Sequence, residues 1–242
     1  MSEPLRAADR GVRSAIPDVG MDLRIAQLMC SRLCHDLVGP AGAVNAGVEF
    51  LDEARGRDDG ALALVAASGR HVTHRLAFFR VAFGLAGGTD GALSLAEARG
   101  LTEGMFAGGR VEVHWPLDGA GADPRPPRPL DVVRLVLCQV RLAAGALPRG
   151  GRVEVRFSEC GQDLQARVSA LGADAALGED LLAAIGPDAS PAELTARTVH
   201  GYYAARLAER LGTAIRIEDH RSDQCRLSVA MPGAANIEAS AA

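Results

Sequence analysis

The sequence predicts an α+β fold in two parts. The first is an N-terminal antiparallel helical hairpin that forms a dimeric four-helix bundle, and the second is a C-terminal α/β sandwich. Two apolar seams with helical spacing occupy residues 21–85, a glycine-rich stretch follows, and helical and strand-like segments then alternate. Five segments are therefore expected: a flexible tail, the hairpin, a linker, the α/β domain and a second tail, over residues 1–20, 21–85, 86–92, 93–233 and 234–242.

The first helix is predicted from an apolar or small residue at every seventh position. This seam consists of Leu23, Cys30, Leu37, Val44 and Leu51. Such spacing is typical of a coiled coil or a bundle helix. Asp22 is expected to cap the N-terminus of the helix, and the polar run at residues 55–60 is expected to end it.

The second helix is expected over residues 59–85, where apolar residues are spaced alternately by three and four. Its seam consists of Leu62, Val65, Gly69, Val72, Leu76, Phe79 and Phe83. Two helices joined by a short loop form an antiparallel hairpin, but they cannot cover both seams. Since a buried Leu, Val or Phe contributes about 1.5–3 kcal/mol only when water is excluded, a second copy is expected to complete a four-helix bundle. The hairpin thus predicts a homodimer.

The remaining elements are predicted from local patterns. Ser94 and Glu97 form a capping box for a helix that ends near Met105. Strands are expected at residues 110–115, 152–158, 165–171, 214–218 and 226–231, and helices at residues 130–146, 179–185 and 195–211. This order predicts a sheet that helices cover on one face.

Composition excludes several classes of function. All 26 basic residues are arginine, so a P-loop lysine and a Schiff-base lysine are excluded. The net charge of -4 argues against nucleic acid as the main partner. No apolar run reaches the roughly 18 residues of a membrane span, and the N-terminus lacks a signal-peptide core. The odd set of five cysteines has no CxxC pair, which indicates reduced thiols and a cytoplasmic location.

The chemically distinctive residue of the first helix is His35. Helical projection places it away from the seam, and a neutral imidazole is nucleophilic near pH 7 because its ordinary pKa is about 6.5. Asp36 is a candidate for polarising the ring, although adjacent helix positions need a favourable rotamer to meet. Pro40 lies inside the helix pattern and predicts a kink beside His35. Periodicity alone leaves open that His35 is an ordinary surface histidine.

A partner that approaches His35 would meet mostly small neighbours. The expected docking face consists of Ser31, Arg32, Val38, Gly39 and Gly42. A catalytic-triad hydrolase has no support, because the sequence lacks G-x-S-x-G. A zinc site from His71 and His74 with Cys30 and Cys34 is conceivable from their spacing. A solvated face is the preferred interpretation of the two histidines.

The segment CSRLCHDL at residues 30–37, followed by Gly39 and Pro40, closely resembles the ChpT-type histidine phosphotransferases. It also resembles the phosphoacceptor box of sensor kinases. RLAFFRVAFG at residues 75–84 resembles the second-helix signature of that family, and the resemblance extends from about residue 24 to residue 232. It implies a helical-hairpin dimer followed by a domain folded like a kinase ATP-binding domain.

The same resemblance implies a role in a two-component phosphorelay. A phosphoryl group would pass from the receiver domain of a hybrid kinase to His35, and then to the receiver aspartate of a response regulator. Phosphoryl transfer depends mainly on positioning and charge stabilisation, and Mg²⁺ is expected on the partner receiver domain.

The resemblance also implies that the kinase-like domain is degenerate. Cys138 and Leu142 fall where a kinase carries asparagines that contact metal and phosphate, and neither offers an oxygen ligand. The expected Asp-x-Gly-x-Gly box reads SALGAD at residues 169–174, and the glycine-rich lid is replaced at residues 196–203. No ATP, bound cofactor or metal is therefore expected on this chain.

Two other functions remain open at this stage. One is a non-catalytic dimeric scaffold that retains a relic histidine-kinase fold, and the other is an active kinase, which the missing ATP boxes disfavour. Labelling of His35 by a phosphorylated receiver domain distinguishes a transferase from a scaffold.

Overall fold

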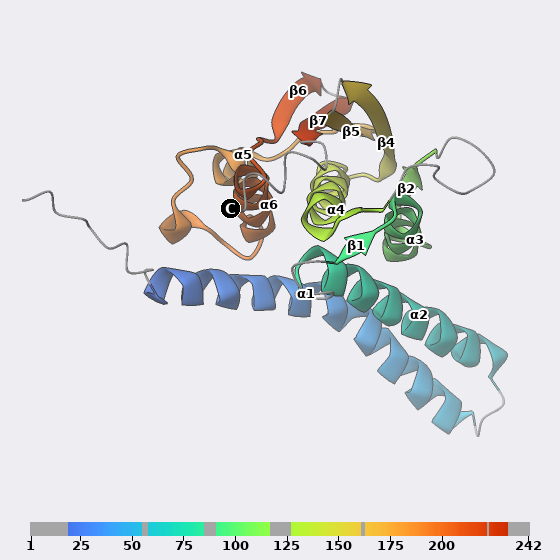
Figure 1. Cartoon of the computed structure of the whole chain (residues 1–242). Helices are drawn as coiled ribbons and strands as arrows, with labels where there is room; N and C mark the ends of the chain where they lie inside the picture. The colour runs from blue at the N-terminus through green and yellow to red at the C-terminus, as the bar shows by residue number, and fades with distance from the viewer. Residues whose placement is uncertain are drawn as a thin grey trace, which may run out of the picture.

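A long helical hairpin lies against a domain of helices and one main sheet (Figure 1). The structure is a computed structural model. It describes residues 19–54, 58–84, 91–116, 127–160, 163–221 and 223–231. The predicted tails, apart from residues 19 and 20, and most of the predicted linker lie outside the described residues.

Helices α1 (Val19–Glu53) and α2 (Asp59–Ala82) form the predicted antiparallel pair. The side chain of Asp58 accepts a hydrogen bond from the backbone N–H of Ala61 and so caps α2. Asp22 lies in the first turn of α1, so its prediction as the N-cap is wrong. A carboxylate in the first turn still favours the helix through the helix dipole.

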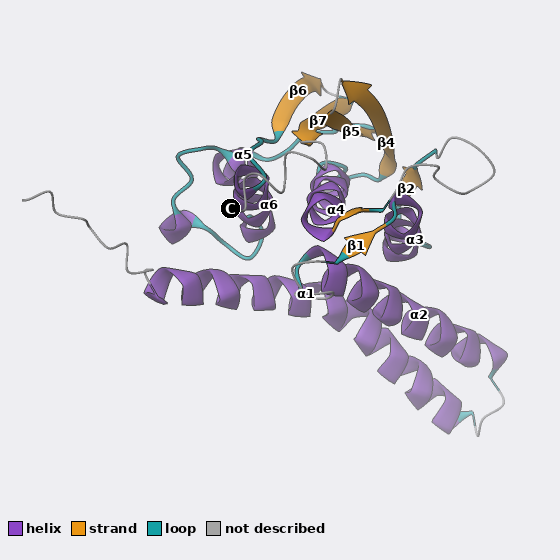
Figure 2. Ribbon diagram, viewed as in Figure 1, coloured by secondary structure: helices purple, strands orange, loops and turns teal. Residues whose placement is uncertain are grey.

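Within the described residues, the main sheet has five strands in the order β2-β4-β5-β7-β6. The strands are β2 (Val111–His114), β4 (Gly151–Cys160), β5 (Asp163–Leu171), β6 (Arg216–Arg221) and β7 (Gln224–Met231). β2 and β4 are parallel, and the other neighbouring pairs are antiparallel. Helices lie on one side of this sheet (Figure 2). The expected sheet covered on one face is therefore present.

The helices of this part are α3 (Leu95–Phe106), α4 (Leu130–Gly145), α5 (Glu179–Ile185) and α6 (Val199–Arg210), with a 3-10 turn at Pro191–Glu193. Ser94 and Glu97 form the predicted capping box of α3. Residue 195 was the expected start of α6, but the helix begins at Val199. The side chain of Thr198 accepts from the backbone N–H of Thr195, which offers that donor an alternative to the helix.

A second, two-stranded sheet was not predicted. Strand β1 (Ala92–Leu93) pairs with β3 (Arg128–Pro129) in antiparallel fashion. Two-residue strands show no alternation of polar and apolar residues, so the pattern that identifies longer strands is missing here. The pairing places the segment that follows the hairpin directly beside the start of α4.

One hydrophobic core joins the hairpin to the C-terminal part. α4 lies at its centre, and Phe78, Phe79 and Ala82 of α2 belong to it. Phe83 contacts Tyr203 of α6 with ring centroids 5.4 Å apart. The prediction that Phe79 and Phe83 belong to the dimer seam is therefore wrong. These rings find apolar partners within their own chain, and the expected boundary near residue 85 does not separate two cores.

Candidate functional site

His35 lies on α1 with its side chain 77% exposed. The neighbouring Ser31, Val38, Gly39 and Gly42 are exposed as well. A Cβ atom added at either glycine would meet nothing within 4 Å. The ring is therefore accessible from solvent across an open helix face.

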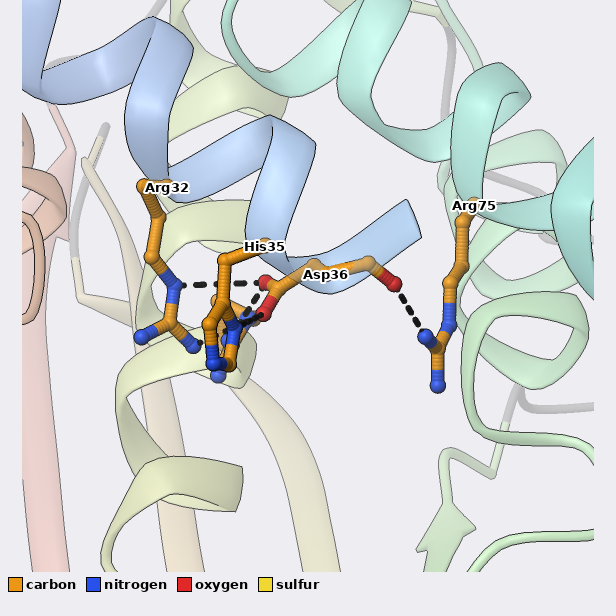
Figure 3. A network of polar contacts seen from close by, with 5 residues as sticks. Arg32, His35, Asp36 and Arg75 are labelled. Atoms are coloured by element: carbon orange, nitrogen blue, oxygen red, sulfur yellow. Dashed lines mark hydrogen bonds and ion pairs between the residues drawn. The ribbon is translucent and has the colours of Figure 1, made fainter. Parts of the chain in front are cut away.

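The carboxylate of Asp36 organises the polar contacts beside His35 (Figure 3). Its side chain is only 11% exposed, and its Oδ1 lies 3.3 Å from Nδ1 of His35. Arg32 Nε donates to Oδ2 over 3.2 Å, and Arg141 Nη2 of α4 donates to the same oxygen over 2.9 Å. The structure thus has the rotamer that lets Asp36 reach the neighbouring ring.

The charges around Asp36 keep it ionised. Burial opposes ionisation, but Arg141 and then Arg32 outweigh it and hold the pKa of Asp36 below its ordinary value. An ionised carboxylate can only accept hydrogen bonds, so the contact with His35 requires a proton on Nδ1. In this tautomer the free lone pair of the ring is on Nε2.

Arg32 is one of the residues expected on the docking face, and it also has a partner within the chain. Its guanidinium pairs with Asp36, with Nη2 3.2 Å from Oδ1, and the side chain is half-buried. Burial, followed by the charge of Arg141, lowers the pKa of Arg32 from its ordinary value. Arg32 therefore belongs to the polar cluster beneath His35.

Pro40 lies within α1, which continues past it to Glu53 and changes direction along its length in Figure 1. Proline has no N–H, so the carbonyl oxygen of Asp36 lacks its helical donor. Nη1 of Arg75, on α2, donates to that oxygen (Figure 3). The second helix of the hairpin thus supplies the hydrogen bond that Pro40 removes next to the candidate site.

The C-terminal part approaches α1 at a second place. The guanidinium of Arg24 donates to the carbonyl oxygens of Pro191, Ala192 and Leu194, over 3.1–3.3 Å. Together with the Arg141–Asp36 pair, these bonds hold the helices of the C-terminal part against the N-terminal half of α1. Neither contact is predicted from the sequence, because no local pattern pairs residues so far apart along the chain.

His200 of α6 lies buried close to this charge cluster. Burial lowers its pKa to about 3, and the charges of Arg141 and Arg32 act in the same direction. Within the described part of the chain, neither ring nitrogen has a hydrogen bond of good geometry, although the backbone of Arg197 lies close enough to oppose the shift. From the sequence, this segment is expected only as the replacement of a glycine-rich lid.

The positions expected to face a nucleotide are in the core. Cys138 and Leu142 are fully buried, and burial raises the pKa of the Cys138 thiol to about 12. Tyr203 of α6, which packs against α4, is also largely buried, and burial raises the pKa of Tyr203 to about 12. α4 and α6 therefore pack against each other at these positions.

The zinc alternative finds no support in the described ranges. They contain no group of three or more His, Cys, Asp or Glu that could hold a metal ion. His71 and His74 are half-buried and pack against Gly108 and Gly104 beside α3, so the prediction of a solvated face is wrong.

Among the helices that the structure describes, none is long and apolar enough to cross a membrane.

Comparison with known proteins gives three findings. The family described as histidine phosphotransferase C-terminal domain matches residues 95–223, more than half of the chain. The protein phosphotransferase ChpT of Brucella abortus (strain 2308) is 33% identical over 201 residues, which cover 83% of this chain and 93% of the relative. A solved structure described as a bacterial phosphotransferase is 31% identical with a TM-score of 0.70, and the match covers 86% of this chain and 96% of that one.

Proposed function

This chain belongs to the ChpT-type histidine phosphotransferases, and from that premise we propose that His35 is the phosphoryl carrier of a phosphorelay. His35 accepts a phosphoryl group from the receiver aspartate of a hybrid histidine kinase and passes it to receiver aspartates of response regulators. The observation that supports this best is an exposed imidazole whose Nδ1 faces an ionised carboxylate.

The proposed chemistry starts from the tautomer that Asp36 favours. The lone pair of Nε2 attacks the phosphorus of the aspartyl phosphate on the donor receiver. The N–P bond forms while the bond from phosphorus to the aspartate oxygen breaks, and the leaving carboxylate takes the electron pair. Because no proton leaves His35, the phosphorylated ring carries a positive charge, which Asp36 offsets across Nδ1.

The second transfer reverses these steps on another receiver domain. The carboxylate of the acceptor attacks phosphorus, the N–P bond breaks, and its electrons return to Nε2. Mg²⁺ held by the receiver offsets the negative charge on the transferred group. The receiver docks on the face that contains Ser31, Val38, Gly39 and Gly42, and Arg32 takes part from beneath that face.

We also propose that this chain does not bind ATP. The buried state of Cys138 and Leu142 supports this, because neither side chain is available to a ligand in solvent. Calorimetry with Mg²⁺ and millimolar ATP provides the test. Millimolar affinity corresponds to about -4 kcal/mol, so even weak saturable binding would be detected and would count against the proposal.

The central test compares two exposed histidines. A receiver domain labelled at its aspartate with radioactive phosphate is mixed with wild-type protein, His35→Gln and the control His114→Gln. His114 lies on β2 and is also exposed. We expect labelling of the wild type and of His114→Gln, and none of His35→Gln. Equal labelling of a folded His35→Gln variant would disprove the proposed role, and an unlabelled wild type would favour the scaffold alternative.

A further inference from the structure

We propose that Arg141 is a positioning residue of the phosphoacceptor site. Through this arginine the C-terminal part of the chain sets the orientation of Asp36 and, through Asp36, the tautomer of His35. The inference rests on the proposed function of His35 and assigns the C-terminal part a role in the reaction.

The two carboxylate oxygens of Asp36 face different partners. Oδ1 faces Nδ1 of His35 at 3.3 Å, whereas Oδ2 accepts from Nη2 of Arg141 at 2.9 Å. A carboxylate is planar, so fixing Oδ2 also fixes the direction in which Oδ1 points. Arg32 contacts both oxygens from the same helix, at 3.2 Å each. Arg141 is the contact that comes from outside the hairpin.

Arg141 also has a stronger electrostatic effect on the carboxyl group of Asp36 than Arg32 has. Burial raises the cost of ionising this carboxyl group, and the strongest effect in the opposite direction comes from Arg141, ahead of Arg32. Without Arg141, a carboxylate that is only 11% exposed would lose its main compensating charge. Without the bond at Oδ2, Oδ1 would no longer be held toward Nδ1 of His35. The ring would then lose the acceptor that keeps its proton on Nδ1, and the proton could move to Nε2, the atom that must attack.

Buried neighbours on α4 hold the backbone of Arg141 in place. α4 lies at the centre of the core, and Val140 and Leu142 on either side of Arg141 are fully buried. The Arg24 contacts with residues 191–194 hold the C-terminal part against α1 at a second place. The guanidinium therefore reaches Asp36 from a helix that is packed into the core, and such support favours accurate positioning of a reacting group.

A docking role for Arg141 predicts different kinetics. Its side chain is 13% exposed, and its Nη2 is engaged with Asp36, so little of it is available to a receiver domain. Loss of a positioning contact lowers the maximal transfer rate, whereas loss of a docking contact raises the receiver concentration that gives half of that rate. The two roles can thus be separated in one experiment.

The experiment uses the full chain with Arg141→Ala, Arg141→Gln, Arg141→Lys and the control Arg149→Ala. Arg149 follows α4, is 72% exposed and pairs with Asp174 at 3.1 Å. Phosphotransfer from a labelled receiver domain is measured over a range of receiver concentrations. Nitrogen chemical shifts of the imidazole report the tautomer of His35 in the unphosphorylated protein, independently of transfer.

We expect Arg141→Ala and Arg141→Gln to lower the maximal rate about tenfold, as for loss of one charge-assisted hydrogen bond. The half-saturating receiver concentration should not change, and the His35 signals should shift toward the tautomer with the proton on Nε2. Arg141→Lys should recover part of the rate, because it keeps the charge without the planar guanidinium. Arg149→Ala should behave as the wild type.

Several results would overturn the inference while leaving the role of His35 intact. They are an unchanged maximal rate with unchanged His35 signals, or an effect confined to the half-saturating concentration. If Arg141→Ala does not fold, Arg141→Gln decides the outcome, because it removes the charge and the guanidinium but keeps much of the side-chain volume. Failure of the proposed function itself would show differently, as transfer that does not depend on His35.

Discussion

Arginines from three different elements contact Asp36. Arg32 comes from its own helix and Arg141 from α4, and both contact the carboxylate, while Arg75 of α2 contacts the carbonyl oxygen. A partly buried carboxylate is costly unless it is paired and hydrogen-bonded. These contacts compensate Asp36 and tie both helices of the hairpin and the C-terminal part to the residue beside His35.

His200 gives a prediction on the dependence of stability on pH. Its pKa is about 3 in the folded chain, against an ordinary value of about 6.5 for the unfolded chain. Between these values the unfolded chain binds a proton that the folded chain does not, so stability falls as pH decreases below about 6.5. At pH 5 the His200 contribution amounts to a loss of roughly 2 kcal/mol.

Chemical unfolding of the wild type and His200→Leu at about pH 7.5 and pH 5 tests this contribution. The drop in the free energy of unfolding between the two pH values should be smaller in the variant by roughly 2 kcal/mol. Comparing the drops cancels any general change in stability that leucine causes. His114→Gln serves as the exposed control. An identical drop in His200→Leu and the wild type would contradict the assignment.

At the scale of elements, the open face of α1 predicts a specific steric effect. Gly42 lies in the helix interior, and nothing lies within 4 Å of a Cβ added there. Gly42→Leu should therefore be accepted by the fold and gain roughly 1 kcal/mol of helix propensity. If receivers dock across this face, the new side chain will raise the half-saturating receiver concentration by about tenfold or more.

Gly100 provides a matched control for this variant. It lies inside α3, is exposed and also has open space at its Cβ position. Gly100→Leu should gain the same helix propensity without any effect on transfer, and thermal unfolding confirms that both variants fold. Normal transfer by Gly42→Leu would mean that the docking face lies elsewhere on the hairpin.

The elements themselves followed closely from local patterns. The expected helix at 179–185 coincides with α5, and the expected helix at 130–146 differs from α4 by one residue at its end. The predicted start of α6 was wrong because a side-chain hydrogen bond at the preceding threonines competes with the helix. Strands β1 and β3 were not predicted because they are too short to show periodicity. Apolar spacing predicts which face of an element is buried, but it says little about which neighbouring element covers that face.

At the scale of the whole molecule, the hairpin remains partly uncovered. In Figure 1 the N-terminal half of α1 runs below α5 and α6, and its C-terminal half pairs with α2. Large apolar side chains on these two helices remain exposed: Leu23, Val38, Val48, Phe50, Leu62, Leu64 and Leu76. Leu23, Leu62 and Leu76 belong to the predicted seams. The single chain thus leaves apolar surface that a second copy would cover.

The proposed homodimer predicts that Leu76→Glu weakens self-association. In the single chain Leu76 is 49% exposed, so glutamate there should leave the fold of each chain intact. In a four-helix bundle it would place one unpaired charge from each copy in an apolar interface, at a cost of several kcal/mol. Sedimentation equilibrium should show a dimeric wild type and a dissociation constant raised at least about 100-fold in the variant.

Ile217→Glu is the control for this prediction. Ile217 is another exposed large apolar residue, but it lies on β6 in the C-terminal part. Its substitution should leave self-association unchanged. A wild type that sediments as a monomer would rule out the dimer, and equal weakening by both variants would locate the interface elsewhere.

Local patterns in the sequence predict the order of the long elements and the chemical character of the first helix. Helical spacing identified α1 and α2, and the segment around His35 and Pro40 indicated both a nucleophilic imidazole and a kink. These features are local, because backbone periodicity and the missing N–H of proline depend only on neighbouring residues.

The surroundings of His35 depend on how distant segments of the chain pack together. Arg75 and Arg141 are 39 and 105 residues away from Asp36 along the chain. Arg75 begins the segment that resembles the second-helix signature, but no local pattern pairs it with Asp36 or distinguishes Arg141 from the other arginines of a chain whose basic residues are all arginine. Phe79 could likewise have faced a second copy or its own core, since apolar burial has no preferred partner until the elements pack. The contacts that orient Asp36 are therefore a property of the fold, because they exist only once α1, α2 and α4 are brought together.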